Sequence, residues 1–224
     1  MLRRLGDALA SSIGKKIVMG LTGLLLTGFL VSHLAGNLKL VPGIGDVEGV
    51  AFDEYVAYLK SFGALLLVAE LGLVALFGCH IYLAFRLTME NREARKQKYV
   101  IRANRGAQTP ASASMFYSGA LILGFLIKHL LDFRFNGAFH EDPSGVTMEA
   151  MRSPGQAWIY ILGSALVGLH LSHGVQSAFQ SLGVNHPQWN PIIKIAGRAL
   201  AVALALGFAW IPIYHLLFAQ GGAG

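Results

Sequence analysis

Residues 157–179 read AWIYILGSALVGLHLSHGVQSAF, an apolar run that carries two histidines, His170 and His173, and no Asp, Glu, Lys or Arg. A helix of about 20 apolar residues is long enough to cross the hydrocarbon core of a membrane. Because water is absent there, the backbone is satisfied within the helix and an imidazole needs a partner from the protein or from a cofactor. The segment therefore predicts a membrane-spanning helix with a binding role.

Apolar runs of this length recur along the 224-residue chain. We expect membrane-spanning helices at residues 16–38, 63–86, 113–135, 157–180 and 192–218. Of all residues 54% are hydrophobic and only 13% are charged, whereas about 25% are charged in a typical soluble domain. The sequence predicts an all-α integral membrane protein in which residues 1–224 form one domain: a four-helix bundle plus a fifth transmembrane helix.

The Lys and Arg residues give a net charge of +6, and their distribution follows a membrane topology rather than a nucleic-acid surface. Most lie on one side of the predicted membrane: Arg3, Arg4, Lys15, Lys16, Arg86, Arg92, Arg95, Lys96, Lys98, Arg102, Arg105, Lys194 and Arg198. By the positive-inside rule we expect a multi-pass protein of the inner (cytoplasmic) membrane with a cytoplasmic N-terminus. Residues 3–13 are weakly amphipathic and predict a segment on the membrane surface. The basic loop after the second span either sets the topology alone or also docks a cytoplasmic partner.

The first four predicted spans all contain histidine: His33, His80, His129 and, in the fourth, His170 and His173. Ionisable groups are rare in membrane spans, so their recurrence indicates a shared function. Because successive helices alternate in direction, His33 and His129 fall in the outer half of the membrane and the others in the inner half. At about 1.5 Å of rise per residue, the two layers are roughly 10–15 Å apart. The histidines thus pair by depth, His33 with His129 and His80 with His170 or His173.

Two imidazoles that face each other across a helix bundle suit a six-coordinate haem iron, and two such pairs predict two b-type haems. A neutral imidazole binds the metal through one nitrogen and donates the other N–H to a local acceptor, often a backbone carbonyl. Small residues near the histidines, Gly36, Ala84, Gly124 and Gly174, favour a flat macrocycle, although tight helix packing also uses such residues. Zinc would require three or four ligands at one depth. The single cysteine, Cys79, excludes an internal disulfide and a cysteine-ligated iron–sulfur cluster.

Two segments resemble a known family. SSIGKKIVMGLTGLLLTGFLVSHLAGNL at 11–38 and HLSHGVQSAFQSLG at 170–183 are similar to the cytochrome b subunits of succinate:quinone oxidoreductases and fumarate reductases, of the single-chain, five-helix, di-haem b558 type. The resemblance covers the whole chain, and its most specific element is the step from His170 to Gly174. It implies haem ligands at His33, His80, His129 and His170, paired as the depth argument pairs them.

The resemblance also implies partners and a reaction. Such a subunit anchors a flavoprotein and an iron–sulfur subunit on the cytoplasmic side of the membrane, and it relays electrons between their clusters and a membrane quinone, expected here to be menaquinone. The chain would then be the quinone-reactive part of an enzyme whose dicarboxylate chemistry, succinate oxidation or fumarate reduction, lies in another subunit. A di-haem cytochrome b of another membrane dehydrogenase and a haem-free membrane protein are the competing interpretations.

The sequence leaves more than one role open for residues near these sites. Gly174 follows His170 by four residues and favours His170 over His173 as the ligand, leaving His173 for haem propionates, a quinone or a neighbouring helix. Some di-haem fumarate reductases have a glutamate two residues before this ligand, where this chain has Gly168. Glu70 is the acid placed deepest in an apolar run, so we expect it beside the outer haem or an outer quinone site, or in an interhelical hydrogen bond.

Overall fold

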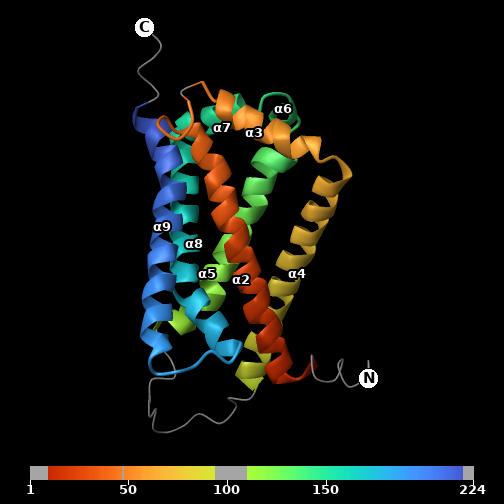
Figure 1. The fold of residues 1–224 in the computed structure, drawn as a ribbon, viewed down its shortest axis with the longest axis vertical. Coiled ribbons are helices and arrows are strands. Elements are labelled where there is room, and N and C mark those ends of the chain that lie inside the picture. The colour runs from red at the N-terminus through yellow and green to blue at the C-terminus, as the bar shows by residue number, and fades with distance from the viewer. Residues whose placement is uncertain (1–9, 47, 94–109, 219–224) are drawn as a thin grey trace.

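A computed structural model describes residues 10–46, 48–93 and 110–218 of the chain (Figure 1). In this part of the chain five helices are long and apolar enough to cross a membrane, and no strand is present. These helices are α2 (Ser12–Asn37), α4 (Ala64–Glu93), α5 (Pro110–His129), α8 (Pro154–Ser181) and α9 (Trp189–Leu217). The prediction of an all-α protein with five such helices is confirmed. Most of the expected surface segment 3–13, and the basic residues between 94 and 109, lie outside the described residues.

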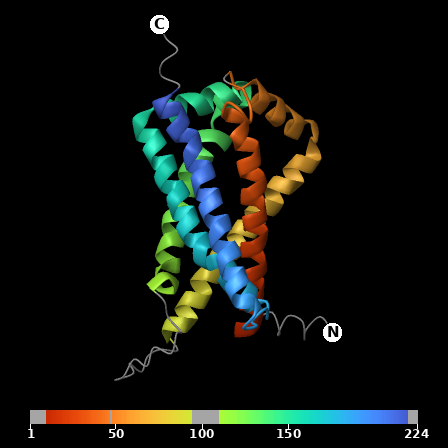
Figure 2. The same cartoon turned by 60° about the vertical axis from the view of Figure 1, so that its left-hand side comes forward.

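The helix pair α8–α9 forms the most closely packed part of the bundle, and the two helices run side by side in Figures 1 and 2. Its contact surface contains small residues, because Gly168 of α8 lies against Ala201 and Ala205 of α9. Leu171 and Val175 of α8 pack with Leu204 of α9 in one apolar cluster. Since lipid is as apolar as leucine, such helices associate mainly through close van der Waals packing.

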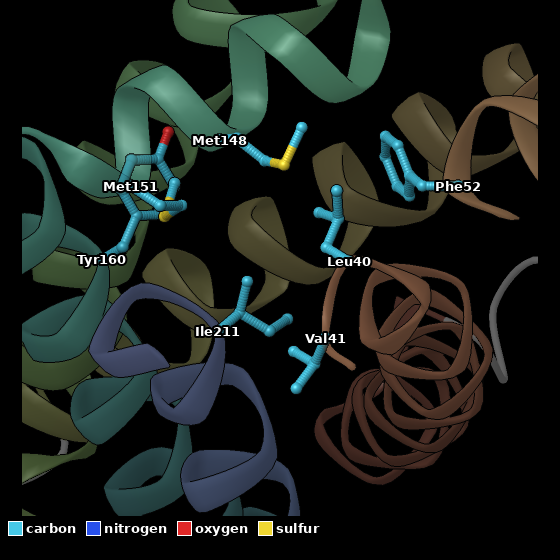
Figure 3. Close-up of a cluster of buried hydrophobic side chains, with 7 residues drawn as sticks. All are labelled: Leu40, Val41, Phe52, Met148, Met151, Tyr160 and Ile211. Carbon is cyan, nitrogen blue, oxygen red and sulfur yellow. The ribbon is translucent and has the colours of Figure 1, made fainter. Parts of the chain in front are cut away.

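Short helices cover one end of the bundle, at the top of Figure 1. They are the 3-10 turn η1 (Leu38–Leu40), α3 (Val50–Ser61), α6 (Gly137–Glu141) and α7 (Pro143–Arg152). Seven residues beneath them form an apolar cluster (Figure 3): Leu40, Val41, Phe52, Met148, Met151, Tyr160 and Ile211. Asp53 joins α3 to α7, because its carboxylate accepts hydrogen bonds from the backbone N–H and the hydroxyl of Ser144, at 2.9 and 2.7 Å. We call this the outer end of the bundle, after the topology expected from the sequence.

Helix α4 diverges from α2 toward the outer end, as Figures 1 and 2 both show. Within the most apolar stretch of α4 no residue is buried, and in α5 very few are. At the opposite end Lys15 of α2 and Glu90 of α4 form an ion pair that holds the two helices together. The apolar flanks of α4 and α5 are therefore only partly covered by the protein itself.

Candidate metal centres

The first pair of predicted ligands meets near the outer end. His33 lies near the end of α2, and His129 is the last residue of α5. Their ring centroids are 5.7 Å apart and the ring planes are nearly perpendicular, at 88°. A bond from a metal to an imidazole nitrogen is about 2 Å long and that nitrogen lies roughly 1 Å from the ring centre, so two imidazoles on opposite sides of one metal have centroids about 6 Å apart. We call His33 and His129 the outer pair.

The surroundings of the outer pair are aromatic. Phe29 stacks on His33 at a centroid distance of 5.2 Å, and Phe133 meets His129 edge-on, also at 5.2 Å. No hydrogen bond joins either imidazole to another side chain within the described part of the chain. Both rings are half-buried, and placing a polar ring among phenylalanines costs free energy unless it binds something. Their geometry therefore favours a ligand held between them.

A polar network adjoins the outer pair because the chain after His129 forms a π-helix, η2 (Leu130–Arg134). Lys128 donates to both carboxylate oxygens of Asp132 at 2.5 Å and to the side-chain oxygen of Gln156 at 2.8 Å. The hydroxyl of the buried Tyr160 donates to Asp132 at 2.6 Å. π-Helical turns are rare and occur often at functional sites. This one places the carboxylate of Asp132 three residues after a candidate ligand, His129, where it meets the ammonium of Lys128 and the phenol of Tyr160.

The second pair consists of His80 of α4 and His170 of α8, and each ring is held by a hydroxyl on a neighbouring helix. Nδ1 of His80 lies 3.1 Å from Oγ1 of Thr22 on α2, and Nδ1 of His170 lies 3.0 Å from Oγ of Ser118 on α5. Thr22 and Ser118 each lie eleven residues before a member of the outer pair, so His80 and His170 lie at one depth of the bundle. We call His80 and His170 the inner pair.

The two hydroxyls also determine the tautomer of the inner pair. Thr22 donates its hydroxyl proton to the carbonyl of Met19 at 3.0 Å, and Ser118 donates to that of Met115 at 3.1 Å. Each hydroxyl oxygen is thus left as an acceptor, so the imidazole donates from Nδ1–H and keeps a lone pair on Nε2. Nε2 is then ready to bind a metal. For each imidazole one acceptor is thus a hydroxyl on another helix.

Glycine follows each of these hydroxyls and lets the ring approach the helix. A Cβ atom on Gly23 would lie 3.3 Å from Cε1 of His80, and one on Gly119 would lie 3.5 Å from Cε1 of His170. Helices α2 and α5 share a spacing: Thr22-Gly23 precedes His33 by eleven residues, and Ser118-Gly119 precedes His129 by eleven. Eleven residues are about three turns, so both features lie on one helix face. This repeated hydroxyl–Gly–x9–His pattern is the sequence signal that could have identified Thr22 and Ser118.

His170 and His173 lie in different surroundings. His170 is held by Ser118, whereas His173 lines a groove between α8 and α9 together with Arg198. The electrostatic neighbours of His173 are Arg198 and Lys194 of α9. The structure therefore brings His170, and not His173, to the face of α8 that contacts Ser118 of α5.

The glycines near the histidines differ in how much space surrounds them. Gly124 has nothing within 4 Å of the place a Cβ would take, and Gly174 would meet only the terminal methyl of Met115, at 3.8 Å. Gly36, expected to leave room for a flat cofactor, instead makes room for the ring of Tyr55 from α3. Space is therefore open at Gly124 and Gly174, whereas protein fills it at Gly36.

The structure also shows which residues contact Gly168 and Glu70. A Cβ on Gly168 would lie 2.6 Å from Cβ of Ala205, so α9 closes over the position at which some fumarate reductases carry a glutamate. Glu70 of α4 accepts a hydrogen bond from Arg134 of η2 at 2.9 Å, and both side chains are partly exposed. The carboxylate is thus paired across helices at the outer end, beside the segment that follows His129.

The donor set distinguishes between kinds of metal site. Among the residues that the structure describes, no group of three or more His, Cys, Asp or Glu side chains could surround one ion. Each pair offers two imidazoles only, so a metal bound there would need its other ligands from a cofactor. Haem, whose porphyrin supplies four nitrogens, would fit this donor set and the uncovered flanks of α4 and α5.

Comparison with protein-family models, with curated proteins and with solved structures finds no match to this chain.

Proposed function

We propose that this chain is a di-haem cytochrome b, the membrane-anchor subunit of a succinate dehydrogenase or fumarate reductase complex. The observation that carries the proposal is the ring contact of His33 with His129 near one end of the bundle, with His80 and His170 each held by a hydroxyl of a neighbouring helix nearer the other end. In α2 the distance from Thr22, which touches the inner pair, to His33 is eleven residues, or about 16 Å along the helix. Two redox centres at this separation would form a relay across the bundle.

The residues of this chain would have defined roles in the relay. His33 and His129 would hold the outer haem, and His80 and His170 the inner one, with Thr22 and Ser118 orienting the inner imidazoles. Haem supplies reversible one-electron transfer when it is bound. The apolar helices exclude water and keep the environment of the iron at low polarity, which is how a protein adjusts a haem potential.

The two ends of the bundle would serve different partners. The flavoprotein and iron–sulfur subunits would dock at the end that carries the N-terminus of α2, where the sequence concentrates its basic residues. Menaquinone would react at the outer end, close to the polar groups of η2 and to the Glu70–Arg134 ion pair. The same distribution of charge supports a location in the inner membrane with a cytoplasmic N-terminus.

A visible spectrum tests the haem part of the proposal. We expect the purified full-length chain to show a b-type band in the reduced-minus-oxidised spectrum, with two haems per chain. His33→Ala and His80→Ala should each remove about half of the absorbance, because each destroys one site. His140→Ala is the matched control, since His140 is exposed and lies in α6. A full band in all three variants, or no band in the wild type, would contradict the assignment and leave a haem-free membrane protein.

The partners are tested by co-purification from the native membrane. We expect a flavoprotein and an iron–sulfur subunit to remain bound and the complex to reduce a quinone analogue with succinate, or to oxidise a quinol analogue with fumarate. If the spectrum shows two haems but the co-purified flavoprotein acts on another substrate, the chain is instead the cytochrome b of another membrane dehydrogenase. The spectrum and the co-purification therefore fail independently.

A further inference from the structure

A groove of about 410 Å³ lies between α8 and α9 and takes no part in the two histidine pairs. Its apolar walls include Ala165 and Leu169 of α8 and Val202 and Ala205 of α9. The side chains of Leu169 and Val202 are 49% and 56% exposed, so the groove is on the lipid-facing flank of the bundle. Figure 2 shows the two helices that form it, α8 and α9, side by side.

The groove has a cationic end. His173 of α8 and Arg198 of α9 both line it, and Lys194 stands one helical turn before Arg198. The ion pairs among the described residues include neither Lys194 nor Arg198, and no acidic residue lines the groove. A positive charge within a membrane helix is costly without a partner. Lys194 and Arg198 are both exposed and have no acidic partner among the described residues, so the cationic end is open to an anion from outside that part of the chain.

The depth of the cations matches that of a lipid headgroup. Helix α9 has 29 residues and is about 43 Å long, which exceeds the roughly 30 Å hydrocarbon core. Arg198, nine residues after the start of α9, thus lies within the length of one side chain of the membrane interface. The apolar part of the groove continues from there toward the middle of the bundle, along the direction that an acyl chain takes.

We propose that this groove binds one anionic phospholipid, with the phosphate held by Arg198 and His173 and an acyl chain lying against Ala165 and Ala205. Charge complementarity selects this occupant. A zwitterionic lipid carries an ammonium that the guanidinium of Arg198 and the ammonium of Lys194 would repel. A quinone head is uncharged and flat, and the groove has no Phe, Tyr or Trp on which such a ring would stack. The proposal depends on the membrane-spanning helices and not on haem or on a dehydrogenase partner.

Native mass spectrometry of the full-length chain in detergent, with added phosphatidylglycerol or phosphatidylcholine, tests the proposal. We expect the wild type to retain one phosphatidylglycerol and to lose phosphatidylcholine under the same conditions. Arg198→Gln should weaken binding of phosphatidylglycerol roughly tenfold, because a charge-assisted contact to the phosphate is lost. Lys16→Gln is the matched control, since Lys16 is an exposed cation at the same end of the bundle.

A second pair of variants tests the apolar part of the site. Ala165→Leu should fill the groove and also weaken retention of phosphatidylglycerol, whereas Ala203→Leu adds the same bulk to an exposed position of α9 outside the groove. Circular dichroism checks that each variant is folded. If Arg198→Gln does not fold, the comparison of Ala165→Leu with Ala203→Leu tests the proposal. Equal binding in a variant and its control, equal retention of the two lipids, or displacement of phosphatidylglycerol by menaquinone would overturn the proposal.

Discussion

The hydroxyl of Thr22 on α2 lies 3.1 Å from Nδ1 of His80 on α4, and it is the contact that orients this imidazole. Because Thr22 donates its own proton to the carbonyl of Met19, it accepts the Nδ1–H of His80 and leaves Nε2 unprotonated. Ser118 does the same for His170 on the other side of the bundle. The hydroxyls that orient His80 and His170 thus come from α2 and α5, two helices that carry neither of these histidines.

Replacing Thr22 by Val should weaken the inner site while leaving the outer one intact. Loss of a hydrogen bond to a metal-ligating histidine commonly costs 10- to 100-fold in affinity, so we expect roughly this loss for one of the two haems. The measurement is haem content per chain after washing, together with the midpoint potentials of the two components. Thr27→Val is the control, because the buried hydroxyl of Thr27 bonds only within α2, to the carbonyl of Gly23 at 2.8 Å. Equal haem loss in both variants would refute the orienting role.

Tyr160→Phe should destabilise the outer end of the bundle. Its hydroxyl donates to the carboxylate of Asp132 at 2.6 Å, and a hydrogen bond to a charged group contributes about 1.5–3 kcal/mol. We expect a lower thermal unfolding temperature in detergent and a shift in the potential of the outer haem only. Tyr117→Phe removes a hydroxyl from an exposed tyrosine of α5 and should change neither quantity. Identical unfolding temperatures for the wild type and Tyr160→Phe would contradict the prediction.

Gly168→Ala should separate α8 from α9. The new Cβ would lie 2.6 Å from Cβ of Ala205 and 3.2 Å from the carbonyl oxygen of Ala201, so the helices must move apart. Overpacking of this kind costs about 1–3 kcal/mol, despite the better helix propensity of alanine. Gly155→Ala, at a position of α8 with open space around it, should be neutral or slightly stabilising. Thermal unfolding of the two variants in the same detergent gives the comparison.

The stability of α3 should depend on pH through Asp46. The backbone N–H of Ala51, followed by those of Val50, Gly49 and Glu48, holds the pKa of this carboxyl below its ordinary value. A lowered folded-state pKa means that the contribution is present above the unfolded-state pKa, about 4, and is lost as the pH falls through the folded-state pKa. Hydrogen exchange of the α3 amides should therefore be faster in Asp46→Asn than in the wild type at neutral pH. The difference in exchange rate between the variant and the wild type should disappear in acid. If it persists in acid, the charge of Asp46 is not its cause.

Glu70→Gln tests the outer end against the proposed function. The substitution removes the charge that pairs with Arg134 at 2.9 Å, and we expect it to slow quinone turnover severalfold while both haem bands remain. Glu90→Gln is the control, because Glu90 pairs with Lys15 and Arg86 at the opposite end. Unchanged turnover in Glu70→Gln would remove this carboxylate from the quinone reaction and leave it a purely interhelical contact.

Much of the fold was predictable because a membrane restricts the choices. Length and apolarity located five long helices, and the observed bounds of α2, α8 and α9 are close to those expected. The short helices α3 and α7 were missed, since segments of 12 and 10 residues are too short to give a spanning signal. Their formation depends on burial of Phe52, Met148 and Met151 over the end of the bundle, which local sequence does not reveal.

The sequence by itself determined that apolar helices cross a membrane and that histidines recur at two depths, because hydropathy and helical rise are properties of single segments. Only the tertiary structure decided which side chains face each other: Thr22 with His80, Ser118 with His170, and His173 with the α8–α9 groove. The physical reason is that rotation of one helix about its axis changes its partners without changing its depth. Packing of small residues such as Gly168 against α9 sets that rotation.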